Sequence, residues 1–517
     1  MSLAIVYSRA NVGVDAPLVT VETHLSNGLP SLTIVGLPET AVRESRERVR
    51  CAILNANLEF PTRRITINLA PADLPKSGGR FDLAIAISIL AASGQLPAPA
   101  LQAYEILGEL ALTGSLRPVQ GILPALLAAR EAGRSLLLPQ SNQVEACLLR
   151  DVQAYAGEHL LQVFQHLQTG KGMQQCHFNE LAAQGYVEED RLDEAANRFG
   201  QIRGQLVAKR ALSIAAAGSH NLLFIGPPGT GKTMLANSLV DLLPPLDEHA
   251  ALEAAAIKSI SRQMIDPLHW RRPVFRAPHH SATSVALVGG GSQASPGEVT
   301  LAHRGVLFLD ELTEFKRSAL EGLREPLESG SITISRANYR LQYPANFQLI
   351  AAMNPCPCGY FGDPQGRCQC PPERVQRYLE KISGPLLDRI DLIVEVPRIS
   401  HEELRRAEPA GSRTSSASAC LRERIGQCQG LQLTRCGARN SDLSNAQIER
   451  YCVLDDRCEA LLERAVNKLS LSPRACQRIL KIARTIADLE GQQNIDVAHL
   501  AEAIGYRRQA RLLKAGA

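Results

Sequence analysis

The sequence contains no apolar run of about 18 residues or more, so no segment is expected to span a membrane. Its 517 residues also lack a strong excess of either charge, with a formal net charge of +4 and a pI near 8.4. This mild excess permits nucleic-acid binding without indicating it, so any such surface must be local. Residues 1–10 lack the charged start and apolar core of a secretion signal. We therefore expect a cytoplasmic protein, in which clustered cysteines indicate a metal rather than disulfides.

The pattern of residues predicts a multidomain α/β protein. Residues 1–168 alternate strand-like and helix-like segments. Residues 169–197 are polar and lack a strong pattern, which indicates a linker. Residues 198–400 read as a second α/β domain, and residues 401–517 have the charged helical pattern of a lid. No internal repeat is visible.

A glycine-rich loop follows the apolar strand 221–225 and leads into a helix. Glycines in such a loop let backbone N–H groups face phosphates, and a helix N-terminus adds positive potential. We expect Lys232 to reach the β- and γ-phosphates of ATP and Thr233 to hold Mg²⁺. The predicted ATP-binding residues are Gly226, Pro227, Pro228, Gly229, Thr230, Gly231, Lys232 and Thr233.

A second apolar strand, 306–309, ends in two carboxylates, Asp310 and Glu311. Asp310 fits a partner of Thr233 in holding Mg²⁺, and Glu311 fits the residue that polarises the attacking water. The alternative is a buried strand followed by a polar helix cap. The order of strand, loop and acidic strand end favours ATP hydrolysis.

Three further residues are candidates for the same site. Asn354 ends a third apolar strand, and ligands lie at the carboxyl ends of parallel strands. It is predicted to contact the γ-phosphate or to orient water, as sensor 1, unless it only starts a turn before Pro355. Arg389 resembles the arginine finger of ring ATPases, which a neighbouring subunit supplies and which contributes roughly 10³–10⁵ in rate. Arg474 resembles the sensor 2 arginine. A surface role is the alternative for both arginines.

These elements, in this order, resemble the AAA+ pattern, which implies a ring of usually six subunits. Two inserted segments indicate which branch of AAA+ proteins the chain resembles. They are residues 285–298 and a predicted β-hairpin that contains Arg336 and Arg340. Both resemble the pore elements of the branch with magnesium chelatase ATPase subunits and MCM helicases, where the hairpin touches DNA. Asn338 stands where such helicases have a lysine, and structural salt bridging is the alternative for the two arginines.

Over its whole length the chain closely resembles the magnesium chelatase-like YifB/ComM family. Residues 32–38 with 41–45, 276–281 and 354–359 carry this resemblance. It implies an ATP-driven homohexameric helicase that promotes branch migration in natural transformation and homologous recombination. Single-stranded and branched DNA and recombination proteins are the implied partners. The alternatives are a magnesium chelatase-type motor subunit, an ATP-dependent protease and a non-translocating scaffold.

The N-terminal domain resembles the Lon protease domain, which has a ribosomal S5-type fold. Residues 75–82 resemble the stretch with the nucleophilic serine of Lon, and that serine aligns with Arg80. Residues 108–121 resemble the stretch before the general-base lysine, which aligns near Leu123. Because proteolysis needs an activated nucleophile and a base, we predict a catalytically dead domain that packs rings or guides DNA.

Two C-x-C pairs lie close together in the sequence, just after the third strand. Four thiolates with glycine and proline turns suit tetrahedral Zn²⁺, although the spacing departs from the usual C-x₂-C knuckle. Free or redox-active thiols are the alternative, and a catalytic zinc is not expected because four cysteines leave no open position. The predicted zinc ligands, within an insertion at 356–370, are Cys356, Cys358, Cys368 and Cys370.

Overall fold

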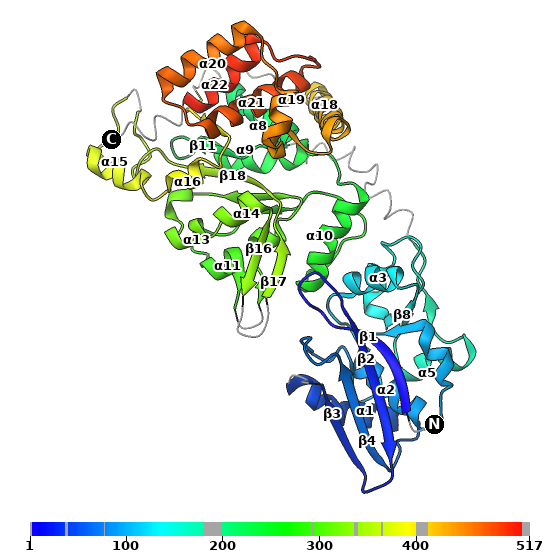
Figure 1. The fold of residues 1–517 in the computed structure, drawn as a ribbon. Helices are drawn as coiled ribbons and strands as arrows, with labels where there is room; N and C mark the ends of the chain where they lie inside the picture. Colours follow the sequence, from blue (N-terminus) through cyan, green and yellow to red (C-terminus); the bar gives the residue numbers. More distant parts are fainter. Residues whose placement is uncertain are drawn as a thin grey trace. The chain divides into compact units, whose positions relative to one another are not determined.

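The computed structural model describes residues 3–36, 40–76, 78–178, 198–291, 294–335, 340–362, 365–399 and 412–508. Contacts divide the chain into two compact units (Figure 1). The first comprises Met1–Val187 with Glu248–Arg271, and the second comprises Glu188–Asp247 with Arg272–Ala517. Among the described residues, no helix combines the length and the apolar character needed to cross a membrane.

The first unit is built on a mixed sheet with the strand order β10-β9-β8-β5-β1-β2-β4-β3. β2 pairs antiparallel with both β1 and β4, whereas β3 runs parallel to β4 and β8 runs parallel to β5 and β9. β2 and β4 bury alternate side chains, as their alternating apolar residues require. The strands are β1 (Leu3–Arg9), β2 (Leu18–Ser26), β3 (Ser31–Val35), β4 (Arg64–Ala70), β5 (Tyr104–Ile106), β8 (Ser135–Pro139), β9 (Ala154–Gly157) and β10 (Gln174–Gln175).

α2 (Asp82–Ala92) is buried over its whole length, because its sequence is apolar on nearly all sides. It packs against β1, β2 and α1 (Thr40–Asn55). Its charged residue Asp82 pairs with Arg48 of α1 at 2.9 Å. The remaining elements are η1 (Ala98–Ala103), β6 (Glu109–Leu110), β7 (Leu116–Arg117), α3 (Ile122–Glu131), η2 (Gln140–Asn142), α4 (Gln143–Ala146) and α5 (Leu160–Thr169).

Two segments depart from a simple division along the sequence. The predicted linker 169–197 begins within the first unit, since β10 pairs with β9; residues 179–197 lie outside the described part. α10 (Glu248–Ile260) lies inside the predicted ATPase range 198–400 but packs on α3 of the first unit. The carbonyl of Ser259 accepts from the Gly121 N–H at 3.1 Å.

The second unit is built on a parallel sheet with the strand order β12-β15-β18-β11-β19. β15 and β18 are buried at every residue, which fits their continuous apolar runs and a sheet covered on both faces. The strands are β11 (Leu222–Ile225), β12 (Phe275–Arg276), β15 (Val306–Leu309), β18 (Gln348–Met353) and β19 (Leu392–Glu395). The helical segments around it include α7 (Arg198–Gln201), α8 (Leu206–Gly218), α9 (Lys232–Ser238), η5 (Val240–Leu242), η6 (Leu312–Glu314), α13 (Arg317–Glu321), α14 (Arg324–Ser329), α15 (Pro372–Leu379) and α16 (Gly384–Leu387).

The predicted β-hairpin before the third strand is confirmed by the antiparallel pairing of β16 (Ser331–Ser335) with β17 (Arg340–Pro344). Residues 336–339 lie outside the described part of the chain. The other insertion forms α11 (Ser284–Val288), β13 (Gly289–Gly290), β14 (Ser295–Pro296) and α12 (Glu298–Leu301). Both hairpins therefore belong to the second unit (Figure 1).

The C-terminal region is helical from residue 412 onward, within the range 401–517 that the sequence predicts as a helical lid. Its elements are α18 (Ser412–Cys436), η7 (Asn440–Asp442), α19 (Asn445–Tyr451), α20 (Asp456–Leu469), α21 (Pro473–Leu489) and α22 (Val497–Arg508). Local sequence sets the helix starts: the side chains of Ser444, Asp455 and Ser472 accept backbone N–H groups as N-caps. In Figure 1 these helices gather in one layer above the parallel sheet.

A buried charge network holds this layer together. The Asp488 carboxylate, whose side chain is 1% exposed, pairs with Arg435 at 2.8 Å and Arg484 at 3.0 Å. Asn440 donates to it at 2.8 Å and also donates to the Thr485 hydroxyl at 3.0 Å. Removal of the carboxylate would leave two arginines without their counter-charge.

We expect Asp488→Ala to destabilise the second unit by about 3–5 kcal/mol, because breaking a buried ion pair leaves uncompensated charge. The thermal unfolding midpoint, followed by circular dichroism, should fall by several degrees. Glu463→Ala is the matched control, since Glu463 is exposed on α20 and its loss should cost no more than about 0.5 kcal/mol. Equal midpoints for the two variants would contradict the structural importance of Asp488.

Candidate nucleotide site

Three neighbouring strands of the parallel sheet deliver the predicted nucleotide-binding residues to one edge. β18 lies between β11 and β15, with Ile225 opposite Met353 and Leu309 opposite Ala351. Because the strands are parallel and in register, the segments after their carboxyl ends meet. These segments are the glycine-rich loop, the acidic pair and Asn354.

The glycine-rich loop has backbone geometry that side chains would obstruct. Gly229 and Gly231 have φ values of 77° and 86°, in the left-handed region that favours glycine. A β-carbon at Gly226 would lie 2.2 Å from the carbonyl oxygen of Val396. The positions of the glycines therefore follow from conformation at two sites and from close backbone approach at the third.

Lys232 is held inside the loop by oxygen atoms. Its ammonium donates to the carbonyls of Gly226 and Pro227, both at 2.8 Å, and to the side-chain oxygen of Asn354 at 3.2 Å. Burial lowers the pKa of the Lys232 ammonium, and the charges of Asp310 and Glu311 oppose that shift. The cation thus sits between the loop and the end of β18, where phosphate oxygens would compete for it.

Thr233 and Asp310 are in direct contact. The Thr233 hydroxyl donates to one carboxylate oxygen of Asp310 at 2.6 Å, and the other oxygen accepts the Glu311 N–H at 2.9 Å. A hydroxyl and a carboxylate are the oxygen ligands that Mg²⁺ prefers. These two side chains would therefore hold Mg²⁺, whose charge would neutralise the phosphates of ATP.

Glu311 has a backbone conformation that is uncommon for its residue type. Its φ and ψ are 51° and 50°, a left-handed conformation of a kind that clusters at functional sites. Its carboxylate lies 3.2 Å from the imidazole Nδ1 of His280. The His280 loop follows β12, whose Arg276 is fixed by hydrogen bonds of 2.7 and 2.8 Å to Glu298. No local pattern in the sequence connects His280 with Glu311.

The predicted arginine finger has a partner that the sequence did not reveal. The Arg389 side chain is 10% exposed, forms an ion pair with Glu328 of α14, and donates to the Pro385 carbonyl at 2.8 Å. Glu328 lies three residues before the hairpin strand β16. Arg389 is therefore joined to the segment that leads into the hairpin.

Arg474 lies in the first turn of α21 with an exposed side chain. One turn later, Arg478 pairs with the buried carboxylate of Asp391 at 2.5 Å. Burial raises the pKa of Asp391, but Arg478, His220 and Arg507 together outweigh that effect and hold the pKa far below its usual range. Arg478 therefore ties α21 to the segment that carries Arg389, a role that sequence reasoning missed.

Two arginines were predicted to contact DNA. Arg340 is the first residue of β17 and its side chain is exposed, whereas Arg336 lies outside the described residues.

In the first unit, the two positions that the sequence resemblance aligns with the catalytic serine and lysine of Lon hold an arginine and a leucine. Arg80 is buried, and burial lowers the pKa of its guanidinium to about 10. Leu123 is fully buried in α3. The neighbouring Lys76 is also buried and donates to the carbonyls of Pro71 and Leu74. Ser77 lies outside the described residues.

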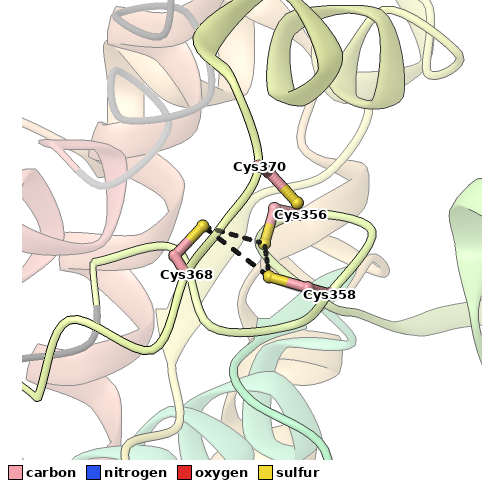
Figure 2. A group of neighbouring side chains, drawn as sticks. All are labelled: Cys356, Cys358, Cys368 and Cys370. Atoms are coloured by element: carbon pink, nitrogen blue, oxygen red, sulfur yellow. Dashed lines mark hydrogen bonds between the residues drawn. The ribbon is translucent and has the colours of Figure 1, made fainter.

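The four predicted zinc ligands come together after β18, as Figure 2 shows. Their sulfur atoms all lie within 4.8 Å of one another. The burial of Cys356 and its hydrogen bonds with neighbouring thiols raise the pKa of its thiol. The cluster is compatible with a structural zinc ion, whose preferred ligands include four cysteine thiolates.

The parallel sheet with its phosphate-binding loop and helical layer defines the class of protein. Residues 198–404 match the family described as magnesium chelatase, subunit ChlI. Residues 21–142 match subunit ChlI of Mg-chelatase, and residues 415–507 match the ChlI C-terminal family. The chain is thus a magnesium chelatase-like AAA+ protein, a class that implies ATP and Mg²⁺ as cofactors.

Similarity to known proteins extends over the full length. The chain is 51% identical to competence protein ComM of Haemophilus influenzae, covering 99% of both chains. It is 48% identical to YifB of Salmonella typhimurium, covering 99% of this chain and 98% of the relative. YifB of Escherichia coli is 46% identical, again covering 99% of this chain and 98% of the relative. The chain belongs to the YifB/ComM family, as the sequence motifs predicted.

We expect Glu311→Gln to bind ATP but to hydrolyse it about 10²–10⁴ times more slowly, because the amide cannot accept a proton from water. Phosphate release measures hydrolysis, and titration with a fluorescent ATP analogue measures binding. Glu314→Gln is the matched control: it removes the same charge three residues later, where Glu314 faces Lys381 at 3.8 Å. Similar losses of hydrolysis in both variants would argue against the assigned role of Glu311.

Proposed function

We propose that this chain is an ATP-dependent DNA helicase that works as a homohexamer and promotes branch migration during natural transformation and homologous recombination. One observation carries the proposal: the two inserted hairpins pack against each other within the ATPase unit. The Tyr343 hydroxyl of β17 donates to the Ala294 carbonyl of the other insertion at 3.0 Å. A β-carbon at Gly289 would lie 2.9 Å from the Cδ1 of Ile334 in β16. Such a pair can move as one element against a strand of DNA.

The Arg389–Glu328 ion pair supplies a physical link between ATP and this hairpin pair. We propose that Arg389 acts in trans on the ATP of a neighbouring subunit. Engaging that phosphate requires Arg389 to leave Glu328, which belongs to α14, directly before β16. The hairpin segment would then respond to the nucleotide in the next subunit of the ring, with Arg474 completing the site from α21.

The name of the Haemophilus relative connects that protein with competence, which supports DNA as the partner here. Single-stranded and branched DNA are the proposed substrates, and recombination proteins are the proposed partners. A chelatase-type motor is the second candidate, because the matching family descriptions are those of magnesium chelatase subunits. The two candidates differ in whether DNA stimulates ATP hydrolysis.

We also propose that the N-terminal region is a Lon-like, S5-type domain without protease activity. The buried Arg80 and the buried Leu123 support this, since neither offers a nucleophile or a base at the aligned positions. A mixed sheet with a central buried helix gives such a domain its stability, and its role would be to pack the ring or to guide DNA.

The decisive experiment uses labelled three- and four-stranded branched DNA with purified protein and ATP–Mg²⁺. We expect the wild type to move the branch and DNA to stimulate its hydrolysis, whereas Lys232→Ala should do neither, because it lacks the phosphate-binding ammonium. If the wild type neither moves the branch nor responds to DNA, the proposal fails. Stimulation by DNA without branch movement would limit the function to DNA binding.

A companion variant tests the hairpin. Arg336→Ala with Arg340→Ala should retain hydrolysis without DNA but weaken DNA binding, lowering the slope of log K against log salt by about 0.7 per lost phosphate contact. Arg317→Ala, which removes an exposed arginine from α13, is the control. An unchanged salt slope in the double variant would exclude these arginines as DNA contacts.

A further inference from the structure

We propose that Cys356, Cys358, Cys368 and Cys370 hold one structural zinc ion, and that the metal-held loop braces the phosphate-binding loop. The metal site is independent of the proposed DNA activity. The expected effect of the metal-held loop on ATP binding depends only on the proposed nucleotide site. The two parts of the inference stand on separate observations, namely the spacing of the sulfur atoms and the contact of Gly359 with Pro228.

The sulfur spacing matches a tetrahedral ion. The Cys356 and Cys358 sulfurs lie 3.3 Å apart, and Cys368 lies 3.8 Å from the first and 3.7 Å from the second (Figure 2). Zinc–sulfur bonds of about 2.3 Å give tetrahedral sulfur–sulfur edges of about 3.8 Å. A disulfide needs about 2.05 Å, and all four cysteines are free thiols. The separations therefore fit shared coordination better than pairing.

The chemistry of the ligands selects the metal class. Four thiolates favour a soft or borderline ion such as zinc and leave no position for water, so the role is structural. The Phe361 N–H donates to the Cys356 sulfur at 3.3 Å, the kind of hydrogen bond that orients a ligand and supports its negative charge. Cys356 is fully buried, so its thiolate would need such compensation.

The loop between Cys358 and Cys368 contacts the phosphate-binding loop. Gly359 donates its N–H to the Cys356 carbonyl at 2.9 Å and has a φ of 84°. A β-carbon there would lie 2.6 Å from the Cδ of Pro228. The ring of Pro228, a residue of the phosphate-binding loop, therefore rests directly on the backbone of the cysteine loop.

The same loop is continuous with the other side of the nucleotide site. Cys356 follows Asn354 by two residues, and the Asn354 oxygen contacts the Lys232 ammonium at 3.2 Å. The metal-held turn thus restrains Pro228 by contact and Asn354 through the chain. Without the metal, the ordering of this turn would rest on far weaker interactions, and both restraints would loosen.

The metal is tested first on the full-length wild type, whose zinc content is measured by plasma mass spectrometry. We expect about one zinc per chain, and about a tenth of that or less in Cys356→Ser with Cys368→Ser, because two ligands are lost. Cys51→Ser with Cys420→Ser is the control, since these cysteines lie in α1 and α18. Refolding the wild type with cobalt should give the intense visible absorption of a tetrahedral cobalt thiolate, which requires no variant.

Wild-type protein without stoichiometric metal and without the cobalt absorption would overturn the site. Disulfides among the four cysteines, detected by mass spectrometry of protein purified without reductant, would also overturn the metal site and indicate redox-active thiols in its place. If the double variant of Cys356 and Cys368 kept its full zinc content, the zinc would have to bind at another site, which would overturn this one. None of these results depends on the movement of DNA, so failure of the metal site and failure of the helicase proposal are distinguishable.

The brace is tested with two glycines of nearly equal conformation. Gly359→Ala should keep its zinc but weaken ATP binding about tenfold, because the new methyl group displaces Pro228. Gly362→Ala is the matched control: its φ is 80°, yet a β-carbon there meets nothing within 4 Å. We expect it to keep both zinc and ATP affinity. Equal ATP affinities for the two zinc-loaded variants would overturn the brace while leaving the metal site intact.

Discussion

The parallel register of β15, β18 and β11 is the constraint on which the rest of the ATPase unit depends. It brings the ends of three strands to one edge, so that Lys232 contacts Asn354 and Thr233 contacts Asp310. Each strand is a run of apolar side chains covered on both faces, so register is fixed by burial while polar residues are confined to the ends. The site is thus a consequence of how the core packs.

Contacts at both edges of the sheet join segments that are far apart in the sequence. The cysteine loop leaves the end of β18 and returns to Pro228, which makes the phosphate-binding loop part of a larger braced structure. At the opposite edge, before the strands begin, Asn221 donates to the Arg389 carbonyl at 2.9 Å, the Arg389 side chain pairs with Glu328, and the two hairpins pack on each other through Tyr343. Both sets of contacts are short and direct, so each restrains a segment that the chain alone would leave free.

The helical layer is joined to the sheet by buried polar groups. His220, just before β11, shares a hydrogen bond of 2.8 Å with Thr485 of α21, and Asp391 binds Arg478 of the same helix. Such networks require every member to be satisfied, so they favour one arrangement of the lid on the core. The first unit has its own buried polar contacts: Glu105 pairs with Arg9 at 2.6 Å and with Arg134 at 3.2 Å, and the buried Lys76 donates to backbone carbonyls.

Local sequence was enough to predict the phosphate-binding loop, the acidic strand end and the hairpin strands, because each depends on neighbours in the chain through glycine conformation, apolar runs and alternating side chains. It also predicted that four cysteines would suit one metal. Folding in three dimensions was needed to place His280 by Glu311, Glu328 by Arg389 and Arg478 by Asp391, and to bring α10 onto α3 within the first unit. Those contacts join residues without local periodicity, and their partners are selected by packing and by the charge that burial leaves uncompensated.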